Sequence, residues 1–124
     1  MPTLIACLST GKGTWAEVNK PIQSQSWTKI FLITNQFGQE NFTNKPENTE
    51  LVLIDTFAPV SSMVEKITSS LKDKISDFEV ALNLASGSGK EHMALLESVL
   101  EMGLNFRVVT LNNYNQMDVL GIKR

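Results

Sequence analysis

The chain has 124 residues, of which 42% are hydrophobic and 19% are charged, and this composition is that of a globular protein rather than a disordered one. Its formal net charge of −2 excludes a bulk electrostatic attraction to nucleic acid or to an anionic membrane. We therefore expect neither duplex nucleic acid nor a membrane among its partners. If the protein binds a phosphate, a few donor or positively charged groups at one site must supply the attraction.

Signals of cellular compartment favour the cytoplasm. The sequence opens Met1-Pro2-Thr3 without the basic segment of a signal peptide, and no apolar run approaches the ~20 residues that span a bilayer. The single cysteine, Cys7, lies inside an apolar run and is interpreted as a buried side chain in a reducing compartment. We expect a soluble cytoplasmic protein.

The chain opens with a strand, a polar loop and a helix. Residues 3–8 form a short apolar run, typical of a strand that is covered on both faces. A glycine-rich segment, 9–13, follows this strand, and a capping-box pattern at 14–17 then starts a helix. Pro21 should kink or end that helix, because proline removes a backbone hydrogen bond. Residues 29–34 form the second buried strand.

The middle of the chain adds one strand and one helix. Residues 35–49 are polar and show no convincing helical pattern, although two phenylalanines there could anchor a short helix. The third strand is 50–55. A capping-box pattern at 62–65 then begins an amphipathic helix, because apolar residues recur there at helical spacing. These apolar residues are Val64, Ile67, Leu71 and Ile75.

The last third of the chain repeats this alternation. Residues 78–84 form the fourth strand, and Ser-Gly-Ser-Gly-Lys at 86–90 is a second glycine-rich loop. A capping box at 88–91 begins a helix that ends at Gly103. The apolar residues that mark this helix are Met93, Leu96, Val99 and Leu100. Two further strands are expected, at 106–111 and, as an edge strand, at 117–122.

Apolar strands that alternate with capped helices predict a mostly parallel sheet between two helical layers. With right-handed crossovers this is a Rossmann-like, doubly wound α/β fold of five to six strands, formed by one domain over residues 1–124. Ligands in such sheets bind beyond the carboxyl ends of the strands, where the strand order reverses. In the order 3-2-1-4-5, the loops after the first and fourth strands meet at that point.

These two loops carry the groups that bind an oxyanion. Glycines let the backbone approach an anion closely, and N–H groups at a helix start carry partial positive charge. Hydroxyl and ammonium groups add further donors, and Asn35 could face the ligand from the end of the second strand. The candidate ligand-binding residues are Ser9, Thr10, Gly11, Lys12, Asn35, Ser86, Gly87, Ser88, Gly89 and Lys90. The alternative is that these residues only form tight turns and helix caps.

Two nucleotide-binding motifs are excluded. A P-loop would need glycine at position 84 and a hydroxyl at 91, where this chain has Leu84 and Glu91. The dinucleotide fingerprint is a weak match, because no third glycine follows Gly11 and Gly13 before Glu17. No catalytic triad or metal cluster can be assembled either, since His92 is the only histidine and Cys7 is buried. We expect no metal and no cofactor.

Three more residues have two interpretations each. His92 is interpreted as a surface histidine in preference to a ligand contact. Asp55 could face a ligand, but an acid at the end of a strand more often caps the following turn. Trp15 could stack on a base or pack in the core.

The segment 80–93, Val-Ala-Leu-Asn-Leu-Ala-Ser-Gly-Ser-Gly-Lys-Glu-His-Met, resembles the N-x-T-G-G-T-K-x-M segment of CARF domains, the CRISPR-associated Rossmann fold. The matching positions are Asn83, Gly87, Lys90 and Met93. The Ser9-Thr10-Gly11 turn is similar to the first loop of that family. The chain departs from the family pattern at Gly89, where the family has threonine, and in the absence of a helix over 35–49.

The resemblance implies a two-fold dimer whose first and fourth loops line a groove for cyclic oligoadenylates, the second messengers of type III CRISPR defence. A stand-alone domain of this kind resembles a ring nuclease, which cleaves the messenger without metal. The 2′-hydroxyl of the ligand attacks the adjacent phosphate and leaves a 2′,3′-cyclic phosphate. By this resemblance Lys90 would stabilise the developing charge, and Ser9 or Thr10 would orient the phosphate or the hydroxyl, which makes these three the catalytic candidates.

Three alternatives remain open at the level of the sequence. The same groove could bind a cyclic tetra- or hexa-adenylate without cutting it, as a sensor or a sequestering module. The domain could instead bind a mononucleotide or another phosphorylated metabolite. It could also be an interaction domain whose loops are only caps.

Overall fold

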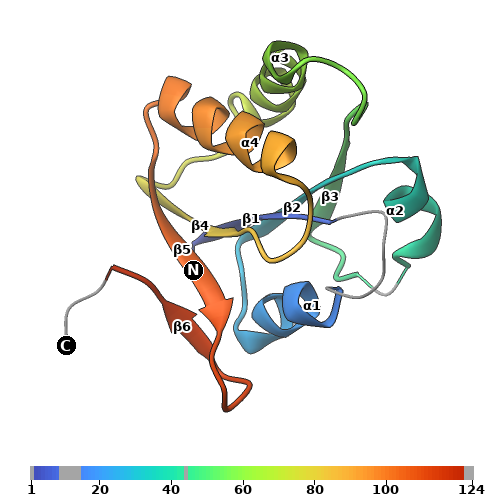
Figure 1. The fold of residues 1–124 in the computed structure, drawn as a ribbon. Coiled ribbons are helices and arrows are strands. Elements are labelled where there is room, and N and C mark those ends of the chain that lie inside the picture. The colour runs from blue at the N-terminus through green and yellow to red at the C-terminus, as the bar shows by residue number, and fades with distance from the viewer. Residues whose placement is uncertain (1, 9–14, 44, 122–124) are drawn as a thin grey trace.

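The computed structural model describes residues 2–8, 15–43 and 45–121. Figure 1 shows its helices and strands in space. The strands are β1 (Thr3–Cys7), β2 (Lys29–Thr34), β3 (Thr49–Leu53), β4 (Glu79–Asn83), β5 (Asn105–Leu111) and β6 (Met117–Val119). The helices are α1 (Trp15–Ser24), α2 (Gln36–Asn41), α3 (Val60–Leu71) and α4 (Gly89–Glu101).

The strands form one six-stranded sheet in the order β3-β2-β1-β4-β5-β6. The first five are parallel to one another, and β6 pairs with β5 in the antiparallel direction. The strand order reverses between β1 and β4. This confirms the predicted Rossmann-like, mostly parallel α/β sheet with its edge strand, and the first five strands have the order that the sequence analysis assumed in placing the site.

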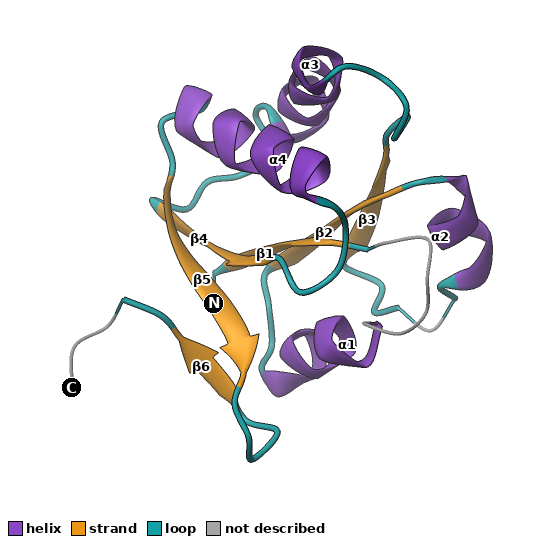
Figure 2. Ribbon diagram, in the orientation of Figure 1, coloured by secondary structure: helices purple, strands orange, loops and turns teal. Residues whose placement is uncertain are grey.

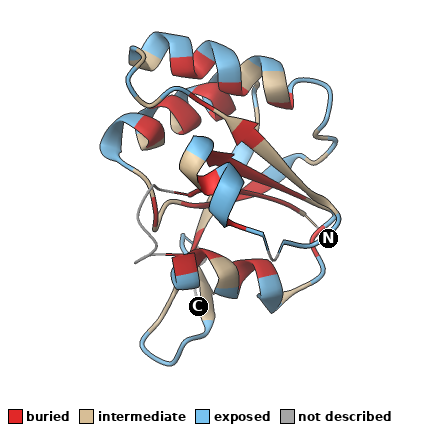
Figure 3. Ribbon diagram, turned by 90° about the vertical axis from the view of Figure 1, so that its right-hand side faces the viewer, coloured by how far each residue is buried: buried red, intermediate tan, exposed pale blue. Residues whose placement is uncertain are grey.

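Helices cover both faces of the sheet, as Figure 2 shows. The helices α3 and α4 pack on one face of the sheet, and α1 and α2 pack on the other. Right-handed crossovers that move in the same direction along the sheet place their helices on the same face. Alternate residues of β1 enter the two cores: Ile5 and Cys7 face α3 and α4, whereas Leu4 and Ala6 face α1. Both faces are therefore buried, which explains why the strand sequences are almost wholly apolar. Figure 3 shows this burial along the central strands.

The segment 35–49 contains a helix that the sequence analysis did not predict. The side chain of Asn35 accepts a hydrogen bond from the Gly38 amide at 3.0 Å and caps α2. Phe42, directly after this short helix, is buried against Trp15, with ring centroids 5.4 Å apart. Tertiary packing of the aromatic rings stabilises a helix too short to show a periodic pattern.

Pro21 was predicted to kink or end α1; the helix continues three residues beyond it, to Ser24, so Pro21 does not end the helix. Pro21 is buried, and its carbonyl accepts hydrogen bonds from the Trp27 ring at 2.8 Å and from the Ser24 hydroxyl at 2.7 Å. These contacts hold the last turn in place. The predicted capping residue of this helix, Thr14, lies outside the described residues.

The start of α3 also differs from the prediction. The helix begins at Val60 after Pro59, which occupies the N-cap position without a side-chain cap, so Ser62 lies inside the helix and forms no capping box. Proline fixes the extended backbone that precedes a helix, and this starts α3 earlier than the serine would. The helix ends at Leu71, and Ile75 packs on the core from the following loop.

The end of α4 agrees with the prediction, but its buried face does not. Gly103 follows the helix with a φ of +72°, as expected of a terminating glycine. Met93 and Leu100, predicted to mark the apolar face, are exposed. The residues that α4 buries are Glu91, Ala94, Leu95, Ser98 and Val99.

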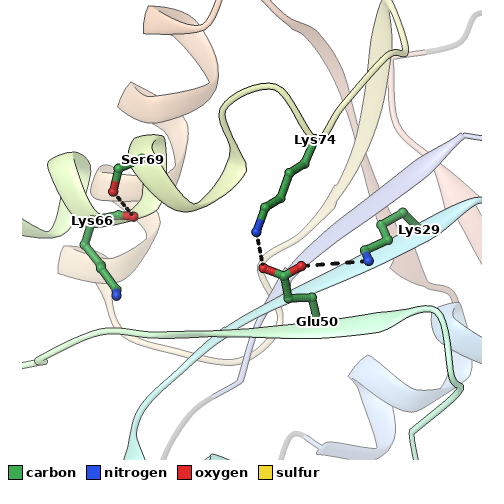
Figure 4. A network of polar contacts seen from close by, with 5 residues as sticks. All are labelled: Lys29, Glu50, Lys66, Ser69 and Lys74. Carbon is green, nitrogen blue, oxygen red and sulfur yellow. Dashed lines mark hydrogen bonds and ion pairs between the residues drawn. The ribbon is translucent and has the colours of Figure 1, made fainter.

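A small ion-pair network joins the loop after α3 to the amino-terminal ends of two strands, as Figure 4 shows. The Glu50 carboxylate contacts the Lys74 ammonium at 2.6 Å and the Lys29 ammonium at 3.8 Å. These partly exposed pairs stabilise the fold by about 1 kcal/mol or less each. They lie at the sheet edge opposite to the two candidate loops.

Candidate functional site

The end of β1 and the end of β4 lie side by side at the carboxyl edge of the sheet. The strands are paired in register, with Ile5 opposite Leu82 and Ala6 opposite Asn83. The loop from β4 to α4 also contacts the end of β1, since a Cβ atom built on Gly87 would lie 3.0 Å from Cys7 Cβ. In Figure 1 the first turn of α4 lies near the end of β1. The point where the strand order reverses is therefore where the second glycine-rich loop lies.

The first glycine-rich loop falls outside the described residues. Ser9, Thr10, Gly11 and Lys12, which include two of the three catalytic candidates, have no structural description. The last residue described before them, Leu8, is buried and donates its amide to the Ile33 carbonyl at 2.9 Å. The chain thus enters that loop from the centre of the carboxyl edge.

Asn83 anchors the start of the second loop. It is 1% exposed, and its amide nitrogen donates to the Val109 carbonyl of β5 at 2.9 Å. Its side-chain oxygen accepts from the Ala85 amide at 3.2 Å. The side chain therefore fixes the direction in which the chain leaves β4. In the sequence, Asn83 was singled out only by the family resemblance.

Gly87 has a φ of +96°, a backbone conformation that side chains disfavour. A Cβ atom at this position would also lie 3.3 Å from both Glu91 and His92. The loop is packed tightly against the first turns of α4, so glycine is required here by conformation and by space.

His92 forms a hydrogen bond with the loop between β4 and α4. Its Nε2 atom lies 2.8 Å from the carbonyl oxygen of Ser86, and because a carbonyl only accepts, the ring nitrogen donates. The peptide bond that follows is trans, so its N–H, on Gly87, points away from the histidine. The imidazole is half-buried rather than a simple surface group, and it orients a backbone donor.

The predicted capping box at the start of α4 is confirmed. The Ser88 side chain accepts from the Glu91 amide, and the Glu91 carboxylate accepts from the Ser88 amide at 3.2 Å. This occupies two of the backbone donors at the helix start and places an acidic side chain, 7% exposed, beside the loop. The amides of Gly87 and Gly89, both candidate ligand-binding residues, take no part in this capping box.

Lys90 extends to the loop between β3 and α3. Its ammonium donates to the Ala58 carbonyl at 3.0 Å and lies 3.5 Å from the Thr56 carbonyl. An ammonium has three N–H groups, and these two carbonyls accept at most two of them. The predicted phosphate-binding lysine therefore also ties together two loops of the carboxyl edge.

Three further candidate residues, Asp55, Asn35 and Trp15, make structural contacts. Asp55 accepts from the Phe57 amide at 2.9 Å and forms the turn after β3, and Asn35 caps α2. Both border a groove at the ends of β2 and β3. Trp15 is 9% exposed and packs in the core, with its ring centroid 5.9 Å from that of Phe37.

Cys7 is a free cysteine whose side chain is buried, and this burial disfavours a role as nucleophile. Burial, and secondarily the nearby Glu91 carboxylate, raise the pKa of its thiol far above its ordinary value. A protonated thiol is unreactive. No group of three or more histidine, cysteine or acidic side chains that could hold a metal ion occurs among residues 2–8, 15–43 and 45–121.

No family model matches the chain, and no curated protein matches it. Within the described ranges, no helix has both the length and the apolar character needed to cross a membrane.

Proposed function

We propose that the carboxyl edge at the β1–β4 junction binds the phosphodiester groups of a cyclic oligoadenylate. The observation that carries this proposal is the orientation of the peptide between Ser86 and Gly87. The histidine contact at 2.8 Å turns the Gly87 N–H away from the helix, next to the point where β1 ends. A backbone donor that points out of a loop before a helix suits an anionic oxygen.

The charge around the loop supports a diester more than a nucleoside polyphosphate. The Glu91 carboxylate stands in the first turn of α4, where a P-loop protein has a hydroxyl for magnesium. Lys90 is the lysine of this loop, and carbonyl groups already accept from it. A phosphodiester carries one negative charge per phosphate, so it needs fewer positive groups in the site than a triphosphate does.

The second candidate is cleavage of the same ring without metal, and the third N–H of Lys90 favours it. That donor could stabilise a phosphorane while the other two remain on the carbonyls of Thr56 and Ala58. The ligand's own 2′-hydroxyl would be the nucleophile, and the protein would hold it in line with the scissile bond.

The experiment incubates the protein with cyclic tetra-adenylate and cyclic hexa-adenylate in EDTA. Calorimetry measures binding, and chromatography detects linear products. We expect binding of one ring, and an affinity about tenfold or more weaker in Lys90→Ala, because a charge-assisted hydrogen bond is lost.

The matched control is Lys72→Ala. Lys72 is an exposed lysine at the end of α3, at the opposite edge of the sheet, and its loss should leave binding unchanged. Binding of neither ring would reject the proposal, and binding without linear product would reject cleavage. Stabilisation by mononucleotides alone would favour the metabolite-binding alternative.

A further inference from the structure

The turn after β3 displays an aromatic ring to solvent. Phe57 is 94% exposed, although it is surrounded in sequence by residues with ordered contacts. Its amide donates to the Asp55 carboxylate at 2.9 Å, and the Ala58 amide donates to the Asp55 carbonyl at 3.1 Å. The Lys90 ammonium holds the Ala58 carbonyl from the other side at 3.0 Å. The turn that exposes this ring is therefore fixed by hydrogen bonds to Asp55 and to Lys90.

A groove lies directly beside this ring. It has a volume of about 440 Å³, and small-molecule sites occupy about 300–1,000 Å³. Its apolar lining comes from Phe37, Leu53 and Ile54, at the ends of β2 and β3. Phe57 and Asp55 border the same groove, so an aromatic face and a carboxylate acceptor stand together over apolar walls.

We propose that this groove and Phe57 form a nucleoside subsite, in which the ring stacks on a base and Asp55 accepts a hydrogen bond from an amino group or a ribose hydroxyl. The inference rests on the proposed function, since it assigns the base-binding part of the same edge. A carboxylate repels phosphate and accepts from neutral donors, which makes this the place for the uncharged part of a nucleotide.

Lys90 connects the turn that carries Phe57 with the loop between β4 and α4. It belongs to the first turn of α4, beside the loop at 84–88, and its ammonium reaches the turn that carries Phe57. A ligand with its phosphate at the β4–α4 loop therefore has an aromatic surface within the reach of one lysine side chain. Phe57 was not among the predicted site residues, and its signal in the sequence is an apolar residue between an acid and Pro59 in a polar turn.

The test measures the affinity of the protein for cyclic tetra-adenylate, AMP and inorganic phosphate by calorimetry. Base–aromatic stacking contributes enough that Phe57→Ala should weaken both adenosine ligands about tenfold. Affinity for inorganic phosphate should stay unchanged, and Phe57→Tyr, which keeps a ring, should retain wild-type affinity. Asp55→Asn should also weaken both adenosine ligands.

The matched control is Phe78→Ala. Phe78 is 90% exposed and directly precedes β4 at the opposite edge of the sheet. Equal affinities of the two alanine variants for AMP and the ring would overturn the inference. So would an equal loss of phosphate binding in Phe57→Ala, which would indicate a disturbed loop. A change of oligomeric state in Phe57→Ala, with ligand affinity intact, would instead make Phe57 a contact between protein chains. If the wild-type protein binds none of the ligands, the proposed function itself fails.

Discussion

At the scale of single residues, the loop after β4 depends on Gly87. Its φ of +96° disfavours any side chain, and a methyl group added there would lie only 3.0 Å from the Cys7 Cβ atom. Gly87→Ala should lower the free energy of unfolding by about 1–3 kcal/mol, because the variant must strain the backbone or displace β1. Urea denaturation measures this change.

Gly89 provides the control for this prediction. It is the first residue of α4, and nothing lies within 4 Å of a Cβ atom built there. Gly89→Ala should therefore leave the stability unchanged or raise it slightly, since alanine favours helix. Equal destabilisation by the two substitutions would contradict the assigned role of Gly87.

Single residues also show where sequence reasoning ends. The serines and glycines of 86–89 indicated an anion loop, and the capping role of Ser88 followed from a local pattern that needs only four residues. The direction of Lys90 did not follow, because its carbonyl partners lie 32 and 34 positions away in the sequence. The contact of His92 with Ser86 escaped the analysis too, since it requires the loop to fold back over the helix.

At the scale of helices, the structure separates a true N-cap from an apparent one. Ser88 forms a capping box at the start of α4, whereas Ser62, predicted to do the same, lies within α3. Ser88→Ala should cost about 1 kcal/mol of stability, because it leaves a helix amide without its acceptor. Thermal unfolding measures the loss.

Ser62→Ala is the matched variant. It removes an exposed hydroxyl from the third residue of α3, which is not the N-cap of this helix, so stability should not fall. A loss in Ser62→Ala as large as that in Ser88→Ala would show that the capping box at 62–65 forms after all.

The helix α4 also carries a pair of acids that makes stability depend on pH. The pKa of Glu101 is raised above its ordinary value, chiefly by a hydrogen bond with Glu97, then by desolvation and by the charge of Glu97. Folding therefore favours the protonated form. The resulting stability is fully present below the ordinary pKa of glutamate and is lost as the pH rises through the raised value.

Glu101→Gln should remove this dependence, because glutamine donates to Glu97 at every pH. We expect the melting temperature of the variant to match that of the wild type in acid and to exceed it slightly at neutral pH. Glu97→Gln, which replaces the other carboxylate of the pair by an amide that donates to Glu101, should behave alike. A difference that is the same at both pH values would contradict the assignment.

Helix boundaries were less predictable than strands for a physical reason. A strand in the centre of a parallel sheet is apolar on both faces, so β2 was predicted with its observed bounds at Lys29 and Thr34. A short helix such as α2 depends on aromatic contacts with Trp15, which no local pattern contains. On α4 the small residues Ala94 and Ser98 allow close packing, with the Ser98 hydroxyl donating to Val64 of α3, while larger apolar residues face solvent.

At the scale of the molecule, the alternation of strands and helices predicted a parallel sheet, because right-handed crossovers leave few topologies, but the strand order was assumed rather than predicted. The observed order places β1 next to β4, and the loops after these strands are the two strand-to-helix connections whose sequences contain glycine. These loops differ from ordinary turns because their glycine-rich composition coincides with the place where the strand order reverses. The ligand does not follow from the fold, since one fold serves many functions.

The stoichiometry of binding tests the proposed ligand at this same scale. A cyclic oligoadenylate has rotational symmetry, and a symmetric ring uses a two-fold dimer best when each chain contributes one β1–β4 edge. We expect calorimetry to give one cyclic tetra-adenylate for two chains, and light scattering to give a dimer in its presence. AMP, which has one phosphate and one base, should bind once per chain to the same edge, so it serves as the internal reference for active protein. A stoichiometry of one ring per chain, or a monomer that binds the ring, would contradict a groove shared by two chains. Each chain would then bind its ligand alone, and the edge would be a site for a mononucleotide.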